Sequence, residues 1–181
     1  MRFLVLAALS AILAGPLRAQ DGPESYRAVQ LEGLAQQRRM LLAMVDSMPE
    51  RLYRVQAEPG QRDFASQVEH IPASLMVLVT RFMRASRPSL PDSAVYLNTR
   101  AGMRRYVVVV YDWAEAVLRN EPAAQRAEIV TFFGARVPRW KVWDELQAHA
   151  WWTGGQLVAN FRRHGMAPPG FTHPVVAPVR R

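Results

Sequence analysis

The chain has 181 residues, which is enough for one domain of ordinary size and too few for two. It contains no cysteine, so disulfides, thiol nucleophiles and thiolate metal ligands are excluded. The formal net charge is +8, but the basic residues are scattered and no run of them forms a nucleic-acid-binding arm. We therefore expect no specific nucleic-acid partner, and attraction to an anionic envelope polymer is the weakest functional hypothesis.

The first residues have the organisation of a secretory signal peptide. Arg2 precedes an apolar run of 13 residues, from Phe3 to Gly15, and a short polar segment follows. A helix that spans a bilayer needs roughly 20 apolar residues, so this run is too short for a stable membrane anchor. We expect residues 1–19 to be removed on export to the periplasm or the medium. Loss of Arg2 and Arg18 with that segment lowers the net charge from +8 to +6.

Two helical patterns come next. Apolar residues recur at steps of three, four and seven between residues 24 and 48, and Pro49 stops this pattern before the turn-like AEPGQRD segment. From Phe64 to Phe82 the steps are strictly four and three, which is the clearest amphipathic pattern in the chain. Pro72 lies inside the second pattern and predicts a kink or a local loosening just beyond His70.

The remaining segments complete a bundle. SRPSLPDSA predicts an irregular crossover to a third helix at about residues 99–119, where YVVVVYDW would also suit a buried strand but its neighbours keep helical spacing. NEPAAQRAEIVTFFG predicts a short helix that ends at Gly134, and the last long helix covers about residues 139–164. Residues 166–181 contain four prolines and predict an extended tail.

These elements predict an all-α fold in one domain. Four long helices with a long connection between the second and third are typical of a four-helix bundle, here over residues 20–165 with one extra short helix.

The last helix carries a line of polar side chains. Glu145, His149 and Thr153 are spaced by four, so they lie on one helical face, and Gln156 and Asn160 extend the line. Such a face can bind a cation, although a polar row is usually the solvent side of an amphipathic helix.

His70 on the second helix is a possible counterpart. It lies at the edge of the buried stripe beside Glu69, where a lone histidine is more often structural than a ligand. Two histidines on two long helices, each near a carboxylate or an amide, can however converge inside a bundle as they do in bundle metal sites. The pair of His70 and His149, rather than either alone, therefore favours a metal site.

Unusual neighbours surround His149. Gly154 and Gly155 each cost a helix roughly 1 kcal/mol relative to alanine, which predicts that another group approaches closely. Trp151 and Trp152 point about 100° apart. We expect one of them in the core and the other lining a cavity or covering a homodimer interface, with most of the four tryptophans of this helix in the core.

Four stretches, in order and over nearly all of the chain after the signal-like segment, together resemble the DinB-like superfamily. They are MLLAMVDSMPERLYRVQAEPGQRDFASQVEHI, VTFFGARVPRW, WDELQAHAWWTGGQLVANFRRHG and MAPPGF. The resemblance implies a four-helix bundle with a long crossover. It also implies a divalent metal, zinc or nickel, held by one His of the second helix and a His-x-x-x-His pair, followed by Arg-Gly-Gln, in the last long helix.

One ligand of this pattern is missing. The resemblance places the first ligand on His70 and the second on His149, but the third falls on Thr153, within TGGQ. Two imidazoles hold a divalent metal weakly and a threonine hydroxyl is a poor ligand, so Glu145 or Glu69 would have to supply an oxygen. Alternatively, His149 and Thr153 hydrogen-bond within a polar pocket that has kept its shape and lost its ion.

Two functional hypotheses follow. Members of the resembled family include metal-dependent thiol transferases and thiol-dependent isomerases, so the first hypothesis is a metal-dependent transferase or hydrolase. Export argues against a small thiol cofactor, because such thiols belong to reducing compartments. The second hypothesis is a non-catalytic extracytoplasmic bundle that binds a small molecule in the former metal pocket or acts as a homodimer.

Overall fold

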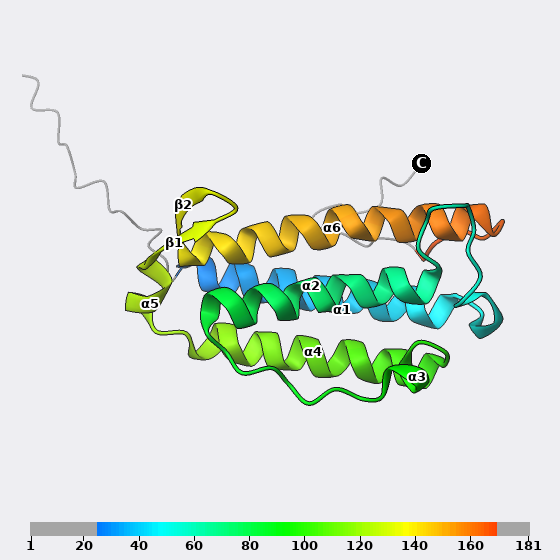
Figure 1. Cartoon of the computed structure of the whole chain (residues 1–181), viewed down its shortest axis with the longest axis horizontal. Helices are drawn as coiled ribbons and strands as arrows, with labels where there is room; N and C mark the ends of the chain where they lie inside the picture. Colours follow the sequence, from blue (N-terminus) through cyan, green and yellow to red (C-terminus); the bar gives the residue numbers. More distant parts are fainter. Residues whose placement is uncertain (1–24, 170–181) are drawn as a thin grey trace, which may run out of the picture.

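The computed structural model describes residues 25–169, so the predicted signal peptide and most of the predicted tail lie outside the described residues. Four long helices run side by side (Figure 1): α1 (Ser25–Ser47), α2 (Phe64–Met83), α4 (Arg100–Asn120) and α6 (Arg139–Arg163). The shorter elements are η1 (Glu50–Leu52), α3 (Ser93–Tyr96), α5 (Ala123–Ala127), β1 (Ile129–Phe132) and β2 (Ala135–Pro138). The predicted all-α bundle is confirmed, with three short helical segments where the sequence predicted one.

Local sequence explains where the helices begin and end. Asp63 precedes α2 and its carboxylate accepts a hydrogen bond of 2.8 Å from the backbone N–H of Ser66. Thr99 caps α4 in the same way through the backbone N–H of Gly102, at 3.1 Å. Helix α2 runs without interruption through Pro72, whose side chain is buried.

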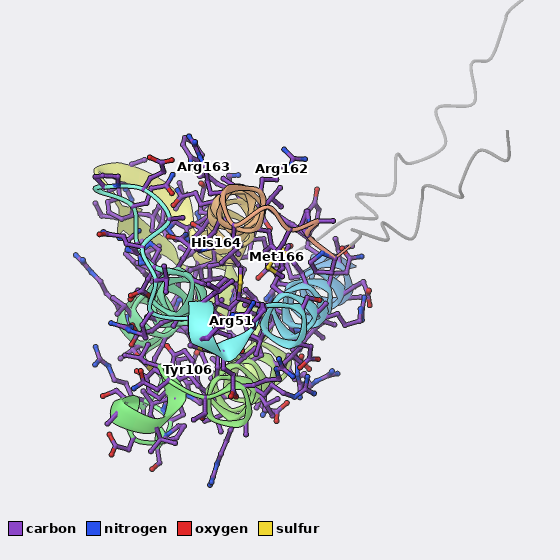
Figure 2. The ribbon with its side chains drawn as sticks, turned by 90° about the vertical axis from the view of Figure 1, so that its right-hand side faces the viewer. Arg51, Tyr106, Arg162, Arg163, His164 and Met166 are labelled. Carbon is purple, nitrogen blue, oxygen red and sulfur yellow. The ribbon has the colours of Figure 1, made fainter. Side chains whose placement is uncertain are left out.

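The core lies between the four helices, which Figure 2 shows end-on. Helix α1 packs mainly on α4, and α2 packs mainly on α6. Phe64 at the start of α2 meets Phe161 near the end of α6, with ring centroids 5.8 Å apart, so these two helices are antiparallel. The segment with the YVVVVYDW run is helical, and its successive turns bury Tyr106, Val110 and Ala114 in this core.

The crossover between α2 and α4 covers residues 84–99, but the connection between α4 and α6, residues 121–138, is longer, so the prediction that the crossover is the longest connection is wrong. Figure 1 shows the crossover running the length of α4 to reach α3. Trp113 of α4 fixes it by donating a hydrogen bond of 2.9 Å to the carbonyl of Ser86. No helix among the described residues is both long enough and apolar enough to cross a membrane.

The predicted short helix that ends at Gly134 is wrong beyond Ala127. Residues 129–132 and 135–138 instead form an antiparallel hairpin in which Phe132 pairs with Ala135. Its two-residue loop, Phe133 and Gly134, has positive φ at both positions (45° and 87°), as in the turns that match the twist of paired strands. The β-branched run from Ile129 favours an extended backbone once residues 135–138 supply a partner strand.

A buried ionic cluster fixes α5 and the hairpin to the bundle. The side chains of Glu121, Arg126 and Arg139 are at most 3 % exposed. The Glu121 carboxylate accepts hydrogen bonds from Arg126, at 3.3 Å, and from the indole N–H of Trp143, at 3.1 Å. Arg139 also pairs with Glu128 at the base of the hairpin. This cluster holds the hairpin at the end of the bundle where α6 begins.

Candidate functional site

The structure brings the two predicted site histidines together. His70 lies near the N-terminal end of α2 and His149 near the middle of α6, and antiparallel packing puts them at the same level. Their ring centroids are 5.3 Å apart and the ring planes are inclined by 58°.

Both imidazoles open into a cavity of about 840 Å³, which we call the histidine pocket. Its walls are α2 and α6, and the hairpin residues Phe132 and Phe133 contribute to its rim. The lining is largely apolar and includes Val77 and Leu78, together with the ring of Trp152. This size and this mixture, apolar walls with a few polar groups, are typical of small-molecule sites.

The environment of both histidines lowers their pKa and so favours the neutral imidazole. Partial burial lowers the pKa of His70, the positive charge of Arg62 and the neighbouring His149 lower it further, and Glu69 acts in the opposite direction. Partial burial and then Arg62 lower the pKa of His149. A neutral imidazole has one donor and one acceptor nitrogen, so each histidine can donate a hydrogen bond to a bound molecule or accept one from it.

The third ligand position does not complete a metal site. Thr153 is buried and lines the histidine pocket, while its carbonyl accepts a hydrogen bond of 3.3 Å from the Gln67 amide. Among residues 25–169, no three His, Cys, Asp or Glu side chains lie close enough together to hold a metal ion.

The two predicted substitutes are engaged elsewhere. Glu145 lines the same pocket but forms an ion pair with Lys141, at 3.5 Å. Glu69 accepts a hydrogen bond of 2.6 Å from the hydroxyl of Tyr96, on the side of α2 that faces α3 and α4. The described residues therefore do not fit a three-ligand metal centre, and we derive no catalytic step through a metal.

A second cavity, which the sequence did not predict, lies further along α6. We call it the Arg62 chamber; its volume is about 570 Å³ and its lining includes Arg62, Gln67, Gln156 and Asn160. Gln156 lines the histidine pocket as well, so the two cavities share a wall residue. The polar line of α6 indicated Gln156 and Asn160, but Arg62 precedes α2 in a segment predicted only as a turn.

The glycine and tryptophan predictions are confirmed in part. A side chain at Gly154 would meet the end of Met40 at 3.1 Å, so a neighbour does approach there, whereas Gly155 faces open space. Neither Trp151 nor Trp152 fills the core, since they are 37 % and 80 % exposed. Helix α6 buries only Trp143 fully, so the prediction that most of its tryptophans lie in the core is wrong, while Trp152 does line the pocket. A homodimer over Trp152 stays a prediction, which sedimentation velocity tests.

Comparison with known proteins gives one match. Neither the curated proteins nor the solved structures yield a match to this chain. The sequence model of the DinB superfamily matches residues 34–164, which include all four long helices in whole or in large part and both histidines. The match covers well over half of the chain. The chain therefore belongs to the DinB superfamily.

Proposed function

We propose that this protein is an exported, non-catalytic binding protein of the DinB superfamily that holds a small, largely apolar molecule in the histidine pocket. The single observation that carries the proposal is the pocket itself, about 840 Å³ in volume with mainly apolar walls and two adjacent neutral histidines. Cavities of this size bury most of the surface of a drug-sized molecule. The apolar walls supply affinity, and the two imidazoles orient the polar group of the ligand.

Loss of the third metal ligand supports binding rather than catalysis. A catalytic metal site usually has three protein ligands and an open position for water. Here a threonine stands at the third position and both nearby carboxylates have other partners. Binding of an apolar molecule, by contrast, needs no missing ligand.

A neutral fluorescent probe tests the proposal directly. Nile red becomes more fluorescent in an apolar environment and carries no charge, so it reports the pocket without electrostatic bias. We expect saturable binding to the parent protein and at least tenfold weaker binding to Ala148→Phe, because the added ring occupies the pocket that Ala148 lines. Ala116→Phe is the matched control, since Ala116 is exposed in the last turns of α4 and lines neither cavity. Equal binding by the two variants would refute the proposal.

A second candidate function, weak divalent-metal binding, is favoured by the proximity of the two imidazoles alone. Zinc and nickel both accept imidazole nitrogen, and bound water or a ligand would complete the shell. Protein purified without chelator, then soaked with zinc or nickel, is analysed for bound metal. One equivalent of metal that disappears in both His70→Ala and His149→Ala supports this function. A metal-free parent protein excludes it.

The missing ligand can also be restored. Thr153→His places an imidazole one helical turn after His149, and we expect this variant to bind zinc at least tenfold more tightly than the parent protein. Isothermal titration measures the difference. Unchanged zinc affinity would mean that the scaffold no longer has the geometry of a three-histidine site.

A further inference from the structure

We propose that the histidine pocket and the Arg62 chamber form one elongated site for an amphipathic carboxylate that carries a hydrogen-bond donor beside its acid group. This inference rests on the proposed binding function and names the class of ligand. The apolar body of the ligand occupies the histidine pocket, and its acid group lies in the Arg62 chamber.

The first argument is continuity. Gln156 lines both cavities, and the Gln67 amide, which lines the Arg62 chamber, bonds the carbonyl of Thr153 in the histidine pocket. Both cavities follow one face of α6, from Glu145 to Asn160. At a rise of 1.5 Å per residue these two positions are about 22 Å apart along the helix axis. The combined site therefore suits an extended molecule.

The second argument is the distribution of charge along this face. Arg62 is the one charged side chain among the described residues that line its chamber, and it forms no ion pair with any described acid. Its neighbour Asp63 is engaged by Arg54 and by the start of α2. At the opposite end, the carboxylate of Glu145 lies against Lys141. The Lys141 ammonium offsets the charge of Glu145, whereas the charge of Arg62 has no described acid partner, so a bound anion is attracted towards the Arg62 end and this sets the direction of the ligand.

The third argument is an acceptor atom without a donor. Asn160 is 2 % exposed and lines the Arg62 chamber, yet its Oδ1 accepts no hydrogen bond from any described residue. A buried acceptor without a partner destabilises a protein, and a ligand N–H or O–H removes that cost. The guanidinium of Arg62 requires an acceptor on the ligand and Asn160 Oδ1 requires a donor. A secondary amide next to a carboxylate, as in an N-acylated amino acid, supplies both.

Three matched probes test the two contacts. N-decanoylglycine has the chain, the amide N–H and the carboxylate; its methyl ester lacks the charge, and N-decanoylsarcosine lacks the N–H. By isothermal titration with protein produced from the full-length chain, we expect the ester to bind about tenfold more weakly than the acid. The sarcosine compound also binds several-fold more weakly. Because the Asn160 contact is tested on the ligand, the result does not depend on whether a variant at this buried position folds.

Variants of the protein assign the charge effect to Arg62. We expect Arg62→Gln, at an exposed position, to bind the acid as weakly as it binds the ester. Arg51→Gln is the matched control: it removes the same charge from η1 (Figure 2), outside both cavities, and leaves the preference for the acid unchanged.

The outcomes separate this inference from the proposed function. Equal binding of acid and ester, or equal losses in Arg62→Gln and Arg51→Gln, overturns the carboxylate contact. Equal binding of the glycine and sarcosine compounds overturns the donor contact. If one of these contacts is overturned but Nile red still binds and Ala148→Phe still blocks its binding, the proposed apolar pocket stands and only this inference fails. If Nile red does not bind, the proposed function fails as well.

Discussion

At the scale of single residues, the adjacency of His70 and His149 is the feature that the sequence predicts best. Both side chains match a family pattern, and helical spacing places each on the side of its helix that meets the other. Arg62 could not be predicted in this way. It lies outside any helix, so no periodicity fixes its direction, and only the packing of α2 on α6 brings its charge near the histidines.

The lowered pKa values of the two histidines make stability depend on pH. As the pH falls below about 6.5, the unfolded chain binds protons that the folded histidines bind only at lower pH. We expect the melting temperature to fall between pH 7 and pH 5 and the decrease to level off below the folded-state pKa values. Circular dichroism measures this.

Two variants identify the source of that decrease. We expect the melting temperature of the double variant His70→Gln, His149→Gln to decrease less than that of the parent protein over the same pH range. Ser74→Ala changes the wall of the same pocket without removing a titrating group, so its pH dependence should equal that of the parent. A double variant with the full parental decrease contradicts the prediction.

At the scale of elements, the long helices follow from the sequence and the hairpin does not. Apolar steps of three and four specify α2 locally, since each step returns to the same face. The run from Ile129 to Phe132 is short and apolar, and such a run suits a strand or a buried helix equally well. Its strand state depends on the partner residues 135–138 and on the buried ionic cluster, both of which are tertiary features.

The ionic cluster gives a prediction about the hairpin. Glu121→Gln removes the carboxylate that pairs with the buried Arg126 and Arg139 and leaves their charges less compensated. We therefore expect the free energy of unfolding to fall by about 3 kcal/mol. Urea denaturation measures this loss. Glu115 lies within α4 and forms ion pairs with Arg119 and Arg38 near the surface, so Glu115→Gln should cost at most about 1 kcal/mol. Similar losses in the two variants would mean that the cluster does not stabilise the fold.

At the scale of the whole molecule, the bundle and its family are predictable from the sequence, but the activity is not. The family model matches residues 34–164, and the helical spacing of the apolar residues predicts the long helices in their order. The resemblance implies a third metal ligand at Thr153, and we propose that the threonine changes the chemistry of the site while α6 stays intact. The proposed function therefore rests on which residues line the pocket and not on the arrangement of the helices.

The predicted export concerns the whole chain and has its own test. If residues 1–19 direct secretion, the protein recovered from the periplasm or medium begins near Gln20, after the LRA segment. Edman sequencing or intact-mass analysis of the recovered protein checks this. Deletion of residues 3–15 should retain the protein in the cytoplasm. Export of the deletion variant, or recovery of an uncleaved chain, would contradict the prediction.

The hairpin turn at the rim of the histidine pocket has a residue, Phe133, that a turn does not favour. Phe133 adopts a left-handed backbone conformation that glycine or asparagine would tolerate at lower cost, and 82 % of its side chain is exposed. A turn maintained for stability alone would favour one of those smaller residues and would gain folding free energy from the exchange. The chain instead keeps an aromatic ring at the mouth of the pocket, where it can meet an incoming molecule. Such a trade of stability for contact is what we expect if the pocket binds a ligand as proposed.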